Sequence, residues 1–217
     1  MVSLPECRSP QPDQPKAQQK PRIDKTAGII LAGGRSSRFG SNKALADFRG
    51  IPLIRQVSDL MDSLFPERLL ITQTPEIYRF LGWPTRPDLI PGQGPLGGIH
   101  AALTAVSAPR CFIAACDMPF LNPGLISYLC AQAGEEWDVV VPCLDQGLEP
   151  LHAVYRKSAL AVIEENLRGG QKKISTCFEQ LRVKKVTQAE IGKIVPDLIT
   201  FCNINRHEDL QDLIQPN

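Results

Sequence analysis

A glycine-rich loop that carries cationic side chains follows the first strongly apolar run of the chain. Residues 27–30 are apolar and lead directly into Leu31-Ala-Gly-Gly-Arg-Ser-Ser-Arg-Phe-Gly-Ser-Asn-Lys43. Glycines let the backbone turn sharply and bring its N–H groups close to a ligand. Successive N–H groups form a concavity for anions, and Arg38 and Lys43 add full positive charges. The segment therefore predicts a polyphosphate site, with a plain turn bearing solvated basic residues as the alternative. The residues expected to contact the ligand through their backbone are Leu31, Ala32, Gly33 and Gly34.

The spacing of this loop excludes the two commonest nucleotide-binding motifs. It does not match the P-loop pattern G-x-x-x-x-G-K-S/T, because Ala44 follows Lys43. It also fails the pattern G-x-G-x-x-G of dinucleotide-binding folds. The ordinary ATPase and dehydrogenase interpretations therefore lose their main support.

A carboxylate follows a second apolar run, in the segment Ala114-Ala-Cys-Asp-Met-Pro119. Asp117 is expected to lie just after a buried strand, at the edge of a sheet. Proteins bind Mg²⁺ through one or two carboxylates together with substrate phosphates. Asp117 is therefore the candidate Mg²⁺ ligand and, with Lys43 and Arg38, a candidate catalytic residue. The alternative role is a helix cap, but the next predicted helix begins only beyond Asn122.

Asp88 and a pair of adjacent glycines form a third candidate site. Gly97 and Gly98 head a predicted helix, where the missing side chains permit close approach of a base or a ribose. The Asp88 carboxylate offers two acceptor oxygens, which match the N1–H and N2–H₂ donors of guanine. Contact with a ribose or a metal would suit Asp88 equally, and a plain turn is the alternative for the glycine-rich segment.

Two later segments carry polar side chains within apolar sequence, Glu149–Tyr155 and Phe201–Asn205. Asn203 and Asn205 alternate with apolar residues, so both are expected on one side of a strand. Their amides could orient phosphates or hold a metal-bound water, and pairing with backbone groups is the alternative for Asn203. His152 is expected to be a packed or hydrogen-bonded histidine rather than a catalytic base.

Short apolar runs alternate with helical patterns from residue 26 onward. Strands are expected over residues 26–31, 68–72, 111–116 and 138–143, with a short one ending at 88–90. Helices are expected over residues 52–65, 75–81, 97–106 and 123–133. After residue 147 we expect an antiparallel strand over 148–155, helices over 158–167, 174–181 and 208–214, and late strands over 182–186 and 198–203.

This alternation predicts an α/β fold with three layers, α/β/α. Its centre is a Rossmann-like, mostly parallel sheet with an antiparallel strand. Right-handed crossovers place the loops that follow the strands along one edge, where such sheets bind ligands. Residues 26–217 are expected to form a single domain. Residues 1–25, rich in proline and polar side chains, are expected to be a disordered tail.

Bulk properties narrow the class of protein. The chain has 217 residues and a formal net charge of +1, which argues against a nucleic-acid binder. No apolar run reaches membrane-spanning length, and the first residues lack the apolar core of a signal peptide, which indicates a cytoplasmic protein. Buried free thiols are expected, rather than zinc ligands or disulfides, for Cys111, Cys116, Cys130, Cys143 and Cys202.

Taken together, these segments resemble the molybdenum cofactor guanylyltransferases, a family of nucleotidyltransferases. The matching patterns are L-A-G-G-x-S-x-R-x-G-x-x-K, C-D-x-P, G-P-L-x-G-I, E-P-L-x-A-x-Y and F-x-N-I-N, in that order over residues 26–210. The resemblance implies the fold of the nucleotide-diphospho-sugar transferases and Mg²⁺ as cofactor. It also implies GTP and molybdopterin as substrates, with transfer of GMP to the terminal phosphate of molybdopterin and release of pyrophosphate.

The resemblance also assigns individual positions. It implies that Asp88 contacts the nucleotide and that Thr72 occupies a nucleotide-contact position that is often Asn. The sequence departs from the family pattern at Asn42, where Asp usually precedes the lysine. Other cofactor-biosynthesis proteins and apo-molybdoenzymes are the further partners that the resemblance implies.

Other functions remain open from the sequence. Within the same chemistry, the alternatives are CMP transfer to molybdopterin and nucleotidyl transfer to a sugar phosphate. A nucleotide-binding module without catalysis is the alternative from another class. The enzyme interpretations require that the cationic loop and Asp117 meet at one triphosphate.

Overall fold

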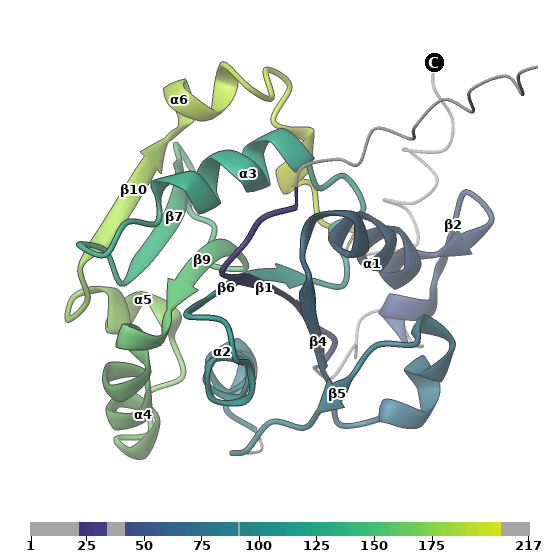
Figure 1. Ribbon diagram of the computed structural model, residues 1–217, viewed down its shortest axis with the longest axis horizontal. Helices are drawn as coiled ribbons and strands as arrows, with labels where there is room; N and C mark the ends of the chain where they lie inside the picture. Colours follow the sequence, from purple (N-terminus) through teal and green to yellow (C-terminus); the bar gives the residue numbers. More distant parts are fainter. Residues whose placement is uncertain (1–21, 34–41, 91, 205–217) are drawn as a thin grey trace, which may run out of the picture.

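The computed structural model describes residues 22–33, 42–90 and 92–204. Within these residues the centre is an eight-stranded mixed sheet of order β10-β7-β9-β6-β1-β4-β5, with β8 paired to β7 (Figure 1). Its strands are β1 (Thr26–Leu31), β4 (Glu67–Ile71), β5 (Thr85–Arg86), β6 (Arg110–Ala115), β7 (Val139–Leu144), β8 (Gly147–Leu148), β9 (His152–Arg156) and β10 (Val183–Thr187). A separate hairpin consists of β2 (Asp47–Phe48) and β3 (Ile51–Pro52).

The central strands run parallel. β1 pairs in parallel with β4 on one side and with β6 on the other, and β5 continues the parallel set beyond β4. Both faces of β1 and β6 are covered, which explains their unbroken apolar sequences. β9 is antiparallel to β6 and to β7. The predicted α/β fold with an antiparallel strand is confirmed.

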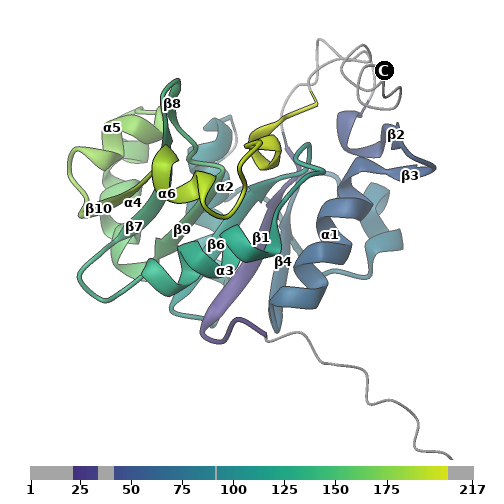
Figure 2. The same cartoon turned by 90° about the horizontal axis from the view of Figure 1, so that it is seen from above.

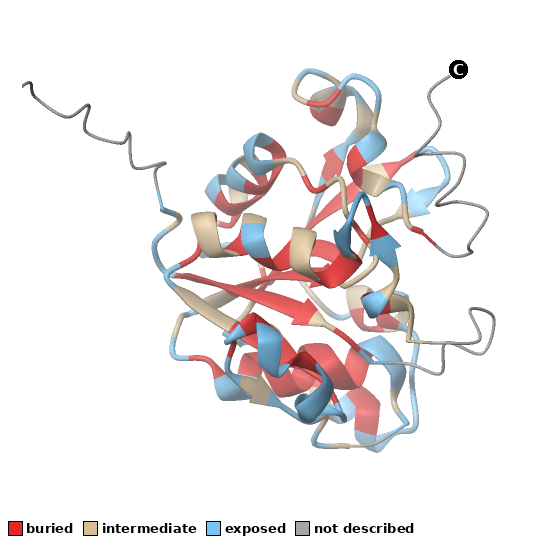
Figure 3. Cartoon of the chain, turned by 90° about the vertical axis from the view of Figure 1, so that its right-hand side faces the viewer, coloured by how far each residue is buried: buried red, intermediate tan, exposed pale blue. Residues whose placement is uncertain are grey.

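Helices cover both faces of the sheet (Figure 1). One face carries α1 (Leu53–Leu64), α3 (Pro123–Gln132) and α6 (Gln188–Gly192). The other carries α2 (Gly94–Ala105), α4 (Leu160–Arg168) and α5 (Ile174–Phe178). Four 3-10 segments occur in the described residues: η1 (Lys43–Leu45), η2 (Pro75–Leu81), η3 (Lys157–Ala159) and η4 (Ile199–Phe201). Figure 3 shows the buried strands between helices whose outer faces are exposed. No helix in these ranges is long and apolar enough to cross a membrane.

Helix α1 fixes the strand that leads into the cationic loop. Its residues Ile54, Val57 and Met61 are buried at helical spacing against the sheet. Phe65, just after the helix, packs directly on β1, and a Cβ at Gly28 would lie 2.5 Å from its ring. Gly28 is therefore required for the contact between helix and strand rather than for flexibility.

The structure corrects several predicted boundaries. The predicted strand at 148–155 is split into β8 and β9 by a turn, and the strand expected to end at 88–90 ends at Arg86. Pro87 follows, which has no N–H to donate to a neighbouring strand. Helix α2 begins at Gly94 rather than residue 97, with Pro95 in its first turn. The predicted helix at 208–214, like residues 1–21 of the predicted tail, lies outside the described residues.

The strand predicted over 198–203 is wrong. Leu198 has a left-handed φ of 53°, and the 3-10 segment η4 follows it. The hydroxyl of buried Thr200 accepts a hydrogen bond from Asn122 N, at 3.1 Å, so this segment is tied to the loop before α3 instead of to a strand. The change also exposes Cys202, which was expected to be buried, whereas Cys111 and Cys130 are buried as predicted.

His152 is a packed histidine, as expected. Its ring lies edge-on to Phe112, with centroids 5.4 Å apart, and 4.9 Å from the ring of Phe201. The residue is fully buried, and neither ring nitrogen has a hydrogen-bond partner among the described residues. Burial lowers the pKa of His152 to about 3.

We predict that His152 makes the protein acid-sensitive. Below about pH 6.5 the unfolded chain protonates this histidine and the folded protein does not, so stability is lost as the pH falls from there towards 3. Between pH 8 and pH 5 the contribution of this histidine is about 2 kcal/mol. Denaturant titrations of the wild type and His152→Leu at both pH values should differ by that amount in their pH dependence. Equal pH dependence in the two proteins would contradict the prediction.

Candidate functional site

The candidate site lies at the carboxyl edge of the parallel strands. Backbone hydrogen bonds extend the sheet past the strand ends, with Cys116 N donating to Leu31 O at 3.3 Å and Ala32 N donating to Ile71 O at 2.9 Å. The first residues of the cationic loop and the segment bearing Asp117 are therefore held side by side. Gly33 follows Ala32 at this edge, whereas Gly34 and Arg38 lie outside the described residues.

Lys43 and Asp117 form an ion pair across this edge. Lys43 Nζ lies 2.5 Å from Asp117 Oδ2, and the two side chains are only 13% and 19% exposed. The residues are 74 positions apart in the chain, so the expected meeting of the cationic loop and Asp117 is confirmed for Lys43. The second oxygen, Asp117 Oδ1, is buried and accepts no hydrogen bond from the described residues.

A short turn presents Lys43 to the site. Asn42 precedes η1 as its N-cap, and its Oδ1 accepts a hydrogen bond from Ala44 N at 3.2 Å. Ala44 is buried, and Ala46 N closes the turn on Lys43 O at 3.1 Å. The backbone of Lys43 is therefore anchored on both sides.

Asp88 lies against the start of α2. A Cβ on Gly98 would lie 3.5 Å from Asp88 Oδ1 and 3.1 Å from the side chain of Leu31, and one on Gly97 would lie 3.1 Å from Gln93 Cβ. The two glycines thus allow the helix to pack closely on β1 and Asp88. Burial raises the pKa of Asp88, and a hydrogen bond with the side chain of Gln73 partly offsets this rise.

Thr72 follows β4 at the same edge. It is buried, and its hydroxyl accepts a hydrogen bond from Thr74 N at 3.2 Å. This contact stabilises the turn after the strand, as threonine hydroxyls commonly do. Contact of Thr72 with a nucleotide stays a prediction.

The segment after η4 returns to Asp117. Ile204 N donates to Asp117 O at 3.1 Å, which brings the adjacent Asn203 to the site although no strand forms there. Figure 2 shows this yellow segment running from α6 towards the ends of β1 and β6. Asn205 lies outside the described residues.

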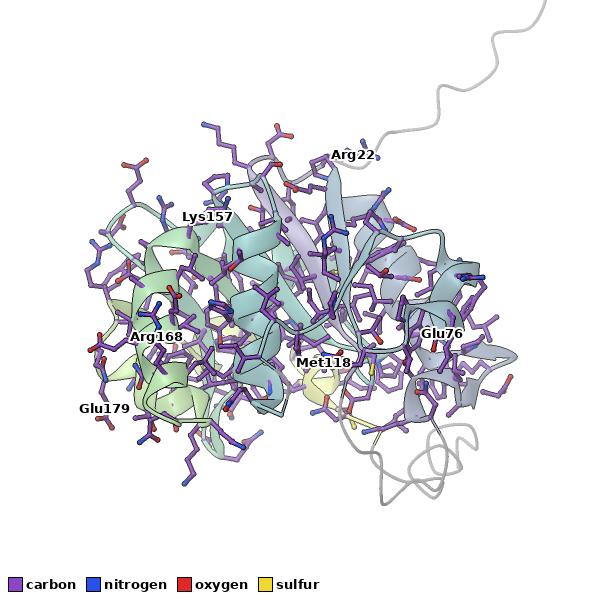
Figure 4. All side chains as sticks on the ribbon, turned by 90° about the horizontal axis from the view of Figure 1, so that it is seen from below. Arg22, Glu76, Met118, Lys157, Arg168 and Glu179 are labelled. Carbon is purple, nitrogen blue, oxygen red and sulfur yellow. The ribbon has the colours of Figure 1, made fainter. Side chains whose placement is uncertain are left out.

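The residues that lead into β9 also lie at this edge. Because β9 runs antiparallel to β6, with Ala114 opposite His152, the residues before His152 extend towards Asp117. Glu149 is among them, and burial raises its pKa. In Figure 4, Met118 lies centrally beside the yellow segment, whereas Arg168 and Glu179 lie well away from it.

The donor set suits a hard cation shared with a substrate. The described residues contain no group of three or more His, Cys, Asp or Glu side chains able to hold a metal. Asp117 instead offers one buried acceptor oxygen, Oδ1, beside a lysine. Magnesium is commonly held in this way, through few carboxylates and the phosphates of a nucleotide.

Sequence reasoning missed one residue that touches the turn bearing Lys43. Tyr78 belongs to η2 and contacts Asn42 through its hydroxyl. The sequence predicted only a short helix over residues 75–81 here. No spacing pattern links residues 42 and 78.

The chain is similar in sequence to known transferases. The MobA-like NTP transferase domain model matches residues 28–185. A probable molybdenum cofactor guanylyltransferase of Pelotomaculum thermopropionicum is 40% identical over 84% of this chain and 89% of its own length. A molybdenum cofactor guanylyltransferase of Desulfosudis oleivorans is 39% identical over 87% of this chain and 94% of its own.

A solved structure matches as well. The crystal structure of molybdopterin-guanine dinucleotide biosynthesis protein A from Archaeoglobus fulgidus superposes with a TM-score of 0.76 at 30% identity. The match covers 86% of this chain and 95% of that one. The family model spans most of the chain, and relatives at 39–40% identity match it over about nine tenths of their own length. The protein therefore belongs to the MobA-like NTP transferase family.

Proposed function

We propose that this protein transfers GMP from GTP to the terminal phosphate of molybdopterin. The observation that carries the proposal is the contact between Lys43 and Asp117 at the carboxyl edge of the sheet. It sets one cation and one carboxylate beside the loop expected to hold a triphosphate. The names of the relatives support the choice of GTP and molybdopterin.

The proposed reaction is a direct displacement. An oxygen of the acceptor phosphate forms a bond to the α-phosphorus of GTP, and the bond from that phosphorus to the bridging oxygen of the β-phosphate breaks. The electron pair leaves with pyrophosphate. The acceptor phosphate is already anionic at neutral pH, so the protein needs neither a covalent intermediate nor a general base. Its task is to hold the two substrates in line and to offset negative charge.

Lys43 and Asp117 have distinct parts in this proposal. Lys43 stabilises the charge that develops on the phosphates, and the backbone from Leu31 to Gly34 supports the same charge through N–H groups. Asp117 would hold Mg²⁺ through its carboxylate, and its buried Oδ1 suits that role. When bound, the ion neutralises phosphate charge.

Asp88 is the residue proposed to recognise the guanine base. Its carboxylate lies beside the amino end of α2 and is partly desolvated. A base without the matching N–H groups would leave the desolvated Asp88 carboxylate without hydrogen-bond donors. Binding of such a base is therefore disfavoured.

We predict that Asp88→Ala reduces discrimination between GTP and inosine triphosphate, which lacks the 2-amino group. The wild type should prefer GTP by at least about tenfold in kcat/KM, and the variant by less than about threefold, because one hydrogen bond to a charged group is lost. Steady-state rates with both nucleotides measure this ratio. An unchanged ratio would remove Asp88 from base recognition and leave a ribose or metal contact.

The decisive test of the function is product formation. Incubation with α-labelled GTP, Mg²⁺ and molybdopterin should place the label in a pterin dinucleotide and release pyrophosphate. Labelling from CTP instead would favour the cytidylyl alternative, and labelling of a sugar phosphate would favour that acceptor. Binding of GTP without any labelled product would favour a non-catalytic module. Thermal stabilisation supports the comparison, since a ligand at 100 times its Kd adds about 2.7 kcal/mol.

A further inference from the structure

A buried tyrosine supports the turn that presents Lys43. Tyr78 lies in η2, after β4, and its side chain is 3% exposed within the core on the α1 face. Its hydroxyl accepts a hydrogen bond from Asn42 Nδ2 at 2.9 Å and lies 3.2 Å from Asn42 Oδ1. The two residues are 36 positions apart, so the contact ties one loop of the edge to another.

Asn42 links this tyrosine to Lys43. The amide that contacts Tyr78 also accepts the hydrogen bond from Ala44 N, which caps the turn. Lys43 lies between Asn42 and Ala44 in the chain, and its Nζ contacts Asp117. Rotation of the Asn42 amide would therefore release the turn and shift the ammonium group.

The phenol is also close to the strand segment that bears Asp117. Burial raises the pKa of Tyr78, the hydrogen bond with Asn42 partly offsets this rise, and the Cys116 thiol adds a smaller contribution to it. The hydroxyl therefore stays protonated at neutral pH. Cys116 directly precedes Asp117 in the chain.

We propose that Tyr78 is a positioning residue for nucleotidyl transfer, which acts through Asn42 to hold Lys43 at Asp117. This inference rests on the proposed function for its turnover readout. It assigns a role to Asn42, the position at which the chain departs from its family pattern. An asparagine can donate to the tyrosine and cap the turn at once, whereas an aspartate can only accept.

The test is a double-mutant cycle between Tyr78→Phe and Lys43→Ala. Tyr78→Phe keeps the buried ring and removes the hydroxyl. Its kcat should fall about tenfold, since small misplacements of catalytic groups cost factors of this size or more. In the Lys43→Ala background the same change should cost less than twofold, because the group that it positions is gone. Loss by the same factor in both backgrounds, or no loss with Lys43 present, would overturn the proposal.

The cycle is also measured as the Kd for GTP, by thermal shift or calorimetry. This readout needs no turnover, so a wild type that binds GTP but makes no product contradicts the proposed function while the cycle still tests Tyr78. Tyr128→Phe is the matched control. Its hydroxyl donates to Glu190 at 3.2 Å, on α6, and the variant should keep wild-type kcat and Kd. An equal loss in this control would overturn the assignment to Tyr78.

Variants at Asn42 test the same link without altering the core. Asn42→Ala removes both the cap and the contact with Tyr78, and should lose about tenfold in kcat. Asn42→Asp retains an acceptor for Ala44 N and for the tyrosine hydroxyl, and should stay within about threefold of the wild type. Equal losses in the two variants, or a loss in neither, would contradict a role for the side-chain hydrogen bonds.

Discussion

Replacement of Asp117 by asparagine is expected to lower turnover by about 10²–10³ while the protein stays folded. The substitution preserves size and removes the charge that faces Lys43 Nζ at 2.5 Å. It also makes the buried side-chain oxygen, Oδ1 in Asp117, a weaker ligand for a cation. The side chain lies in a loop after β6 rather than in the core, so its amide is tolerated. Rates of pyrophosphate release under saturating GTP, with a thermal melt of each protein, measure both parts of the prediction.

Asp59→Asn is the matched control for this change. Asp59 lies on α1, is 55% exposed and has only a loose contact with Arg55, at 3.6 Å. Exposed pairs of this kind contribute little to stability, so this variant should keep the wild-type rate. Near-wild-type turnover in Asp117→Asn would remove the carboxylate from the mechanism. A large drop in melting temperature would instead make Asp117 a structural residue.

The sheet and its functional edge could be predicted because local patterns determine them. β1 and β6 are buried on both faces, so their sequences are continuous apolar runs that begin and end sharply. Parallel strands joined by helices must bring their following loops to one edge. The prediction that Lys43 and Asp117 meet followed from this rule, without any information on side-chain contacts.

Other parts of the site depend on tertiary contacts that no local pattern carries. The mostly apolar segment 198–203 was predicted to be a strand, yet buried Thr200 binds the loop before α3 and a 3-10 turn forms. Asn203 still reaches the site, through the hydrogen bond between Ile204 N and Asp117 O. The contact of Tyr78 with the turn could not be predicted for the same reason, because its partner Asn42 is distant in sequence.

Gly97 and Gly98 show how one sequence signal can have two causes. Adjacent glycines before a helix are typical of a close ligand approach, and the sequence predicted such an approach. In the structure a Cβ at Gly98 would make a tight contact with the Leu31 side chain, at 3.1 Å. Close packing therefore favours glycine here even without a ligand. The effect of Asp88→Ala on base preference, rather than any substitution of these glycines, is the informative test of recognition.

Replacement of Lys43 by alanine is expected to lower kcat/KM for GTP by about 10², because one electrostatic contact to the phosphates is lost. Lys43→Arg should recover only part of this loss. The guanidinium is planar and larger, and it does not fit a point contact between an ammonium group and one carboxylate oxygen. Steady-state kinetics with GTP varied at fixed acceptor concentration measure both effects.

The contact between Lys43 and Asp117 also predicts how their losses combine. Residues that act as a unit are strongly non-additive, so Lys43→Ala combined with Asp117→Asn should be little worse than Asp117→Asn alone. Lys193→Ala, an exposed lysine just after α6, is the charge-matched control and should behave as the wild type. Fully multiplicative losses in the double variant would mean that the two side chains serve separate steps, and the ion pair would then be incidental to catalysis.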